Sequence, residues 1–195
     1  MMTRLEALSV IHKMSEGMPV ISTCGATSRE LSSLGRRNNT LYVVDSMGLT
    51  PSISIGVSMG LEDSSAKKCI GIEGDGGVLM NPNALSSAAF LNPEKCVIVI
   101  LDNECFGSTG GQRSMATKID LGAVAEGFGL AVLRANSIET MEAAMEEAIE
   151  NPGPWVIHAR ILPGNVPGTP FLNQDPVVVA YNFSQFILST KQSKS

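Results

Sequence analysis

Short apolar runs alternate with stretches of helical spacing along most of the chain. Leu5, Leu8, Ile11 and Met14 recur at helical intervals and predict an N-terminal helix. Further helices are predicted at residues 27–34, 52–61, 83–91, 121–128 and 138–150. Apolar runs of strand length lie between the helices, at residues 19–22, 41–44, 68–72, 97–101, 131–133 and 155–161.

This alternation predicts right-handed βαβ units and a parallel sheet, because strands separated by helices pair in parallel. The strands are almost unbroken apolar runs, which is typical of parallel strands buried on both sides. We therefore expect an α/β fold, a doubly wound parallel sheet with helices on both faces, formed by residues 1–195 as one domain. The tail after Pro163, of which residues 165–195 are the main part, is rich in proline and glycine. We expect it to pack on this domain, with a short helix near residues 183–188 and a frayed end from Lys191.

Composition narrows the class of protein. The formal net charge is −5, from 14 basic and 19 acidic residues, and no basic stripe is present, so nucleic acid is not an expected partner. No apolar stretch is long enough to span a membrane, and the N-terminus does not resemble a signal peptide, so the expected location is the cytoplasm. The four cysteines form no C-x-x-C pair, which argues against a zinc or iron–sulfur site. Cys69 and Cys96 lead into strands and are expected to be buried free thiols.

Glycine and polar residues cluster where four predicted strands end, at residues 25–28, 45–48, 74–77 and 102–112. Ligands of open α/β sheets bind at the carboxyl ends of the strands, so these clusters predict a binding site. Asp75 lies among glycines, and Asn103 follows the next strand along the chain. Their oxygens, with one backbone carbonyl, suit Mg²⁺, whose remaining ligands would be phosphate oxygens and water. By itself, a Gly-Asp-Gly sequence is equally a tight turn.

The spacing of these residues resembles a known family. Gly74-Asp75-Gly76, then 26 residues (77 to 102), then Asn103 is similar to the signature of thiamine diphosphate enzymes. The resemblance implies the thiamine diphosphate-binding fold of the family's PP-type domain, with the metal held by Asp75, Asn103 and the Cys105 carbonyl. The segment from Asp45 to Leu49 resembles the part that clasps the aminopyrimidine ring. There Met47 would be the catalytic wedge that bends the cofactor, and the alternative is that Met47 is ordinary core.

Two more loops make the resemblance specific to sulfopyruvate and phosphonopyruvate decarboxylases. The segment 108–112 is similar to one of their loops, and 25–30 is similar to their diphosphate-side loop, although Thr27 or Ser28 is alternatively a simple helix cap. Arg29 and Arg113 are candidate anion clamps and equally candidates for surface ion pairs. His12 and His158 are expected to be structural. The resemblance implies these cofactor-binding residues: Gly25, Thr27, Ser28, Asp45, Ser46, Met47, Gly74, Asp75, Gly76, Gly77, Asn103, Cys105, Phe106, Gly107 and Ser108.

The function implied is that of a thiamine diphosphate- and Mg²⁺-dependent decarboxylase subunit. Its substrate would be a small anionic 2-oxoacid, sulfopyruvate first and phosphonopyruvate second. A pyrimidine-binding α subunit would supply the activating glutamate, in a hetero-oligomer with β–β contacts. The alternatives are the small subunit of a 2-oxoacid oxidoreductase, a carboligating synthase, and a non-catalytic cofactor-binding partner. The sequence gives Glu104, beside the metal loop, no role.

Overall fold

A computed structural model describes residues 1–191. Eight α-helices lie in this part of the chain: α1 Arg4–Met14, α2 Ala26–Ser33, α3 Thr50–Met59, α4 Asp75–Met80, α5 Asn83–Leu91, α6 Leu121–Gly127, α7 Ile138–Glu150 and α8 Pro176–Thr190. The strands are β1 Val20–Ser22, β2 Thr40–Tyr42, β3 Cys69–Gly74, β4 Cys96–Asp102, β5 Cys105–Phe106, β6 Gln112–Arg113, β7 Ala131–Ala135 and β8 Trp155–Arg160. A short 3₁₀ helix, Met115–Thr117, follows β6.

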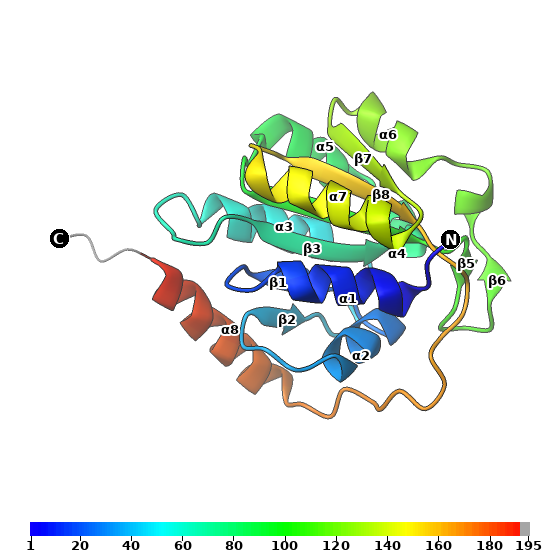
Figure 1. Ribbon diagram of the computed structural model, residues 1–195, viewed down its shortest axis with the longest axis horizontal. Helices are drawn as coiled ribbons and strands as arrows, with labels where there is room; N and C mark the ends of the chain where they lie inside the picture. Colours follow the sequence, from blue (N-terminus) through cyan, green and yellow to red (C-terminus); the bar gives the residue numbers. More distant parts are fainter. Residues whose placement is uncertain (192–195) are drawn as a thin grey trace.

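Six of these strands form one parallel sheet in the order β2-β1-β3-β4-β8-β7. Helices cover both faces, with α1 and α7 in front and α3 and α5 behind in the view of Figure 1. The predicted α/β fold, a parallel sheet covered on both faces, is therefore confirmed.

The central strand β4 shows why its sequence is continuously apolar. All seven of its residues are buried. Val97, Val99 and Leu101 join the cluster that includes residues of α1 and α7, whereas Ile98 and Ile100 join the cluster on the opposite face. Side chains of a strand alternate between its two faces, so a strand covered on both sides needs apolar residues at every position. The thiols of Cys69 and Cys96 are buried and free, as predicted.

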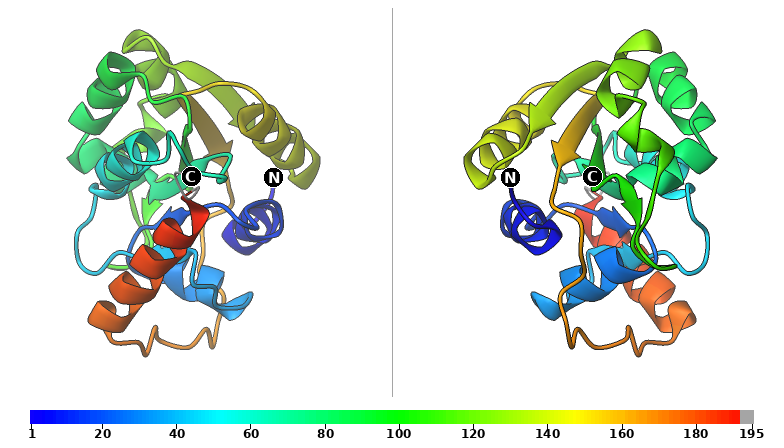
Figure 2. Two further views of the ribbon diagram at one scale, coloured as in Figure 1. Left: turned by 90° about the vertical axis from the view of Figure 1, so that its left-hand side faces the viewer. Right: turned by 90° about the vertical axis from the view of Figure 1, so that its right-hand side faces the viewer.

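The last part of the described chain packs on the β2 edge of the sheet. The segment 162–175 runs along the outside of the molecule from β8 to α8 (Figure 2). α8 contacts β2 and contributes Val179 and Phe183 to two core clusters. This helix is longer than the one predicted near residues 183–188, since it begins after the Asp175 N-cap with proline in its first turn. The predicted fraying falls mainly on residues outside the described part.

Three other details differ from the sequence predictions. α4 begins directly at Asp75, although two glycines in its first turn lower helix propensity. Residues 105–113 form a small β5–β6 hairpin. α2 has Gly25 as its N-cap, so the prediction that Thr27 or Ser28 caps this helix is wrong. No helix in residues 1–191 is long and apolar enough to cross a membrane.

Candidate functional site

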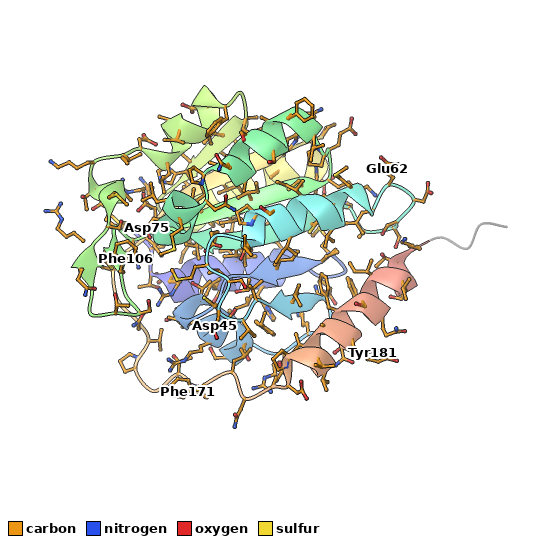
Figure 3. All side chains as sticks on the ribbon, turned by 180° about the vertical axis from the view of Figure 1, so that it is seen from behind. Asp45, Glu62, Asp75, Phe106, Phe171 and Tyr181 are labelled. Atoms are coloured by element: carbon orange, nitrogen blue, oxygen red, sulfur yellow. The ribbon has the colours of Figure 1, made fainter. Side chains whose placement is uncertain are left out.

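The carboxyl ends of β1, β3 and β4 meet at one edge of the sheet. β3 pairs with β4 in parallel with Gly74 opposite Leu101, so the loops that follow these residues emerge side by side. Asp75 and Phe106 accordingly lie close together at this end of the molecule (Figure 3). β1 pairs with the other side of β3 and adds the loop that leads into α2.

A pocket opens between these loops. Most of the residues predicted from the sequence line it: Gly25, Thr27, Met47, Gly74, Asp75, Gly76, Gly77, Asn103, Cys105, Phe106, Gly107 and Ser108. Residues that the sequence analysis did not assign to the site also line it: Arg4, Thr23, Cys24, Ala26, Glu73, Leu101, Ile161 and Asn165. Ser28, Asp45 and Ser46 are not part of this lining.

Asp75 is a nearly buried carboxylate at the start of α4, with 3% of its surface exposed. Its Oδ2 accepts a hydrogen bond from the Ser114 hydroxyl. Burial raises the pKa of the Asp75 carboxyl, the Ser114 bond opposes this shift, and the charge of Asp102 adds to it. Both burial and the neighbouring carboxylate favour neutralising Asp75, by a proton or by a bound cation.

Asn103 and the hairpin after it form the neighbouring part of the pocket wall. The Asn103 Oδ1 accepts a hydrogen bond from the backbone N–H of Cys105, 3.1 Å away, which fixes the amide side chain relative to that loop. Glu104, between them, has a φ of +56°, a left-handed conformation that is uncommon outside glycine. Its carboxylate pairs with Arg160 and its carbonyl accepts from the Ser114 N–H. Glu104 therefore holds the turn that presents Asn103 and Cys105.

Two glycines of the Gly74–Gly77 loop have no room for a side chain. A Cβ on Gly76 would lie 2.5 Å from the ring of Phe106. A Cβ on Gly77 would lie 2.3 Å from Oε1 of Glu73. Glycine is required at these positions because neighbouring side chains occupy the space that a Cβ would take.

Glu73 is a buried carboxylate that connects two loops of the pocket. Its Oε1 accepts from the Gly74 N–H (2.9 Å) and its Oε2 from the Gly48 N–H (3.1 Å). Burial raises the pKa of the Glu73 carboxyl, and hydrogen bonds from its neighbours partly offset this. Glu73 thereby fixes the Met47 loop against the Asp75 loop. Glu73 could not be recognised from the sequence, because an acidic residue at the end of a strand has no distinctive local signal.

The Asp45–Met47 segment lies beside the pocket and reaches it through one residue. Met47 lines the pocket and is 41% exposed, so it is not an ordinary core methionine. Asp45 is exposed and has a φ of +53°. The charge of Asp45 also contributes to the raised pKa of the Cys24 thiol, after burial and Glu73, which places this segment near the β1 loop.

The loop before α2 is open toward the pocket. Gly25 has a φ of +78°, and no atom lies within 4 Å of where its Cβ would stand. Thr27 lines the pocket, whereas the Ser28 hydroxyl is buried and donates to the Thr23 carbonyl at 2.6 Å. Ser28 thus braces the end of β1.

The structure places the candidate clamp Arg29 away from the pocket. Its guanidinium donates to the carbonyls of Thr169 and Pro170 and lies over the ring of Phe171, 4.3 Å from the centroid. Arg29 therefore anchors the segment 162–175. The other candidate, Arg113, is exposed on β6 and lies at a neighbouring hollow with Asn103 and Cys105.

His158 has the structural role expected of it. Its Nε2 lies 2.8 Å from Oδ2 of Asp102, and its Nδ1 accepts from the Gly122 N–H at 3.2 Å. An accepting Nδ1 leaves the proton on Nε2, which donates to Asp102. Asp102 also accepts from the Glu104 N–H, so His158 supports the Asn103 turn from behind.

Comparisons with known proteins agree with this geometry. The family model described as "Thiamine pyrophosphate enzyme, C-terminal TPP binding domain" matches residues 23–159. Sulfopyruvate decarboxylase subunit beta of Methanothermobacter thermautotrophicus is 37% identical over 165 residues, which cover 85% of each chain. That of Methanocaldococcus jannaschii is 34% identical and covers 91% of this chain and 93% of its own. This chain belongs to the thiamine diphosphate-binding domain family.

A further relative and one solved structure extend the comparison. Phosphonopyruvate decarboxylase of Streptomyces viridochromogenes is 32% identical over 95% of this chain, which corresponds to 46% of that protein. The solved structure of benzoylformate decarboxylase from Polynucleobacter necessarius has a TM-score of 0.72 and 18% identity, over 83% of this chain and 33% of that one. At this level of identity, the solved structure supports the fold alone.

The donor set at this pocket suits a hard cation. Residues 1–191 contain no group of three or more His, Cys, Asp and Glu side chains able to hold a metal. Asp75, Asn103 and the Cys105 carbonyl instead offer one carboxylate, one amide oxygen and one backbone oxygen. Mg²⁺ takes few protein ligands when phosphate supplies others, so this sparse oxygen set fits it and does not fit a softer metal.

The close packing of Glu73 and Gly77 gives a prediction for stability. Gly77→Ala should lower the free energy of unfolding by about 1–3 kcal/mol, because the new methyl group would collide with Glu73. In the Glu73→Asp background, the acid is one methylene shorter and the same change should cost less, with a coupling on the order of 1 kcal/mol. Urea unfolding of the parent, the two single variants and the double variant measures the cost of Gly77→Ala and its coupling to Glu73→Asp.

Gly127→Ala is the matched control, since that helical position in α6 has no atom within 4 Å of a Cβ. It should be neutral or stabilising, because alanine is the better helix former. Equal costs of Gly77→Ala in the two backgrounds would contradict the proposed collision.

Proposed function

We propose that this chain is the β-type subunit of a thiamine diphosphate- and Mg²⁺-dependent decarboxylase that acts on an anionic 3-substituted pyruvate. The observation that carries the proposal is the convergence of Asp75, Asn103 and Cys105 on one pocket beside Gly25 and Met47. Relatives named sulfopyruvate decarboxylase subunit beta, which match nearly the whole chain, support this choice of reaction.

The metal and the diphosphate would occupy the ends of β1, β3 and β4. Asp75, the Asn103 amide oxygen and the Cys105 carbonyl would hold Mg²⁺. The diphosphate would lie against the backbone of the Gly25–Thr27 and Gly74–Gly77 loops, with Phe106, Gly107 and Ser108 completing the wall. The first turn of α2 supports this assignment, because its N–H groups have no side-chain cap and a helix start favours anions.

The aminopyrimidine side would be formed by the Asp45–Met47 segment. The Asp45 carbonyl and the Met47 N–H would bind the ring, and the Met47 side chain would support the bent shape of the cofactor. Ser46 would line the same side, and Ser28 would act by bracing the β1 loop. The exposure of Met47 supports this role, since a 41% exposed methionine at a pocket is available to a ligand.

When bound, thiamine diphosphate supplies an electron sink for decarboxylation. The residues of this chain would orient the cofactor and keep its charged end fixed. Glu73 would hold the Met47 loop in register with the diphosphate loop through its two backbone hydrogen bonds. The activating glutamate would come from the pyrimidine-binding α subunit, in a hetero-oligomer with β–β contacts.

The substrate assignment rests on the relatives. Sulfopyruvate ranks first because proteins named for it are matched over most of their length, and phosphonopyruvate ranks second. The products would be CO₂ and the aldehyde. A 2-oxoacid oxidoreductase or a carboligating synthase is less favoured, because decarboxylases lead the comparisons.

The metal assignment predicts the effect of removing one carboxylate. In the complex of this chain with its α-type partner, Asp75→Ala should weaken Mg²⁺-dependent binding of thiamine diphosphate by roughly 100-fold, since a charged ligand is lost. Titration calorimetry measures the affinity. Glu62→Ala, far from the pocket (Figure 3), is the control and should bind like the parent. Parental affinity in Asp75→Ala would remove the metal assignment.

The two-chain proposal predicts where activity resides. The purified chain alone should release no aldehyde from sulfopyruvate or phosphonopyruvate, and co-expression with a pyrimidine-domain chain should restore turnover. The reason is that loss of the group that activates the cofactor removes at least the usual 10²–10⁴-fold of acid–base catalysis. A coupled aldehyde assay measures this, and turnover by the lone chain would refute the two-chain model.

A further inference from the structure

Arg4 is a buried guanidinium at the pocket, and the proposed function does not use it. Arg4 as a whole is 7% exposed, and it lines the same pocket as Asp75 and Asn103. It lies in the first turn of α1, outside residues 23–159, which the family model matches.

The hydrogen bonds of Arg4 use only part of its donor set. Nε donates to Oε2 of Glu30 at 3.0 Å. Nη2 donates to Oε1 of Glu30 at 2.8 Å, to the Gly164 carbonyl at 3.0 Å and to Oδ1 of Asn165 at 2.6 Å. Nη1 takes part in none of these four bonds. A guanidinium has five N–H donors in a rigid fork, so the bonds that hold its Nε–Nη2 side also fix the direction of the Nη1 donors.

The charges around the pocket call for a cation. Among the described residues that line it, Arg4 is the one basic side chain, and Glu73 and Asp75 are the two acidic ones. Cys105 lines the same pocket as Asp75 and Arg4, and its thiol is affected by the charge of each of them. A diphosphate with one Mg²⁺ keeps negative charge, and a guanidinium donor directed at it favours its binding beside these carboxylates.

Three residues hold Arg4 in place: Glu30, Gly164 and Asn165. Of these, only Asn165 also lines the pocket. The Glu30 carboxylate also accepts from the Val166 N–H at 3.1 Å, and Asn165 donates to the Gly107 carbonyl at 3.2 Å. These bonds connect α1, α2, the segment after β8 and the loop of Gly107. The guanidinium is thus preorganised, and little rotamer entropy would be lost on contact with an anion.

We propose that Arg4 is a diphosphate-binding residue, with Nη1 donating to the cofactor's diphosphate at the wall formed by Cys105 and Gly107. This inference rests on the proposed function. The competing explanation is purely structural, in which Arg4 only pins the segment after β8 through Glu30 and Asn165. The two explanations differ in what a loss of Arg4 does to ligands with and without phosphate.

The test compares thiamine diphosphate with thiamine on the complex of this chain with its α-type partner. Arg4→Met should weaken binding of the diphosphate by about 10- to 100-fold, the usual effect of losing a charged hydrogen bond, and should leave thiamine within about twofold. Arg4→Lys, which keeps the charge and loses the fork, should lie between these limits. Calorimetry in the presence of Mg²⁺ gives each affinity.

Two further variants separate binding from folding. Glu30→Gln breaks the ion pair and leaves Arg4 in the pocket, so it should lower the melting temperature with less loss of diphosphate affinity than Arg4→Met. If Arg4→Met does not fold, the double variant Arg4→Met/Glu30→Met removes both charges, and neutral replacement of a buried ion pair is generally tolerated. That variant should retain its fold and still lose the preference for diphosphate over thiamine.

The outcomes are distinct. Selective loss of diphosphate affinity on removal of Arg4 supports the inference. Unchanged affinity, or an equal loss for both ligands, overturns it and leaves the proposed function intact. If the parental complex binds no thiamine diphosphate, the proposed function fails and the role of Arg4 fails with it.

Discussion

The parallel pairing of β3 with β4 is the constraint on which the candidate site depends. Its register places Gly74 opposite Leu101, so the chain leaves the sheet at neighbouring points, first toward Asp75 and later toward Asn103. The two residues are far apart in sequence, and no local interaction would bring them together. Apolar packing on both faces of β4 stabilises the pairing, so the core that folds the protein also assembles the site.

The same edge of the sheet concentrates negative charge. Glu73, Asp75 and Asp102 are each at most 3% exposed and lie at the ends of two adjacent strands. Each accepts hydrogen bonds from fixed donors: backbone N–H groups for Glu73, Ser114 for Asp75, and His158 with a backbone N–H for Asp102. Such bonds compensate for lost solvation, and a bound cation would relieve the remaining repulsion.

The sequence was sufficient for the parts of the site that depend on local order and spacing. Strand ends and glycine positions could be predicted because strand period and loop chemistry are local, whereas the link between Asp75 and Asn103 came from the resemblance of their spacing to the family signature. The position of Arg4 at the pocket could not be predicted, because its partner Asn165 is 161 residues away and no motif signals that contact. Arg29 is the opposite case, because the sequence made it a candidate for the site and the structure does not place it there. Its guanidinium lies beside a binding loop but donates to the carbonyl of Thr169, in a segment far along the chain. Ser28, predicted to bind the cofactor, lies under the loop and donates to the Thr23 carbonyl.

A crystal structure of the two-chain complex with thiamine diphosphate and Mn²⁺ in place of Mg²⁺ tests the central claim most directly. Anomalous scattering locates the metal and the phosphorus atoms independently of the protein. We expect a manganese peak between the Asp75 carboxylate, the Asn103 amide oxygen and the Cys105 carbonyl. The diphosphate should lie against the Gly25 loop, and Met47 should contact both rings of a bent cofactor. A metal held by other residues, or an extended cofactor away from Met47, would contradict this claim.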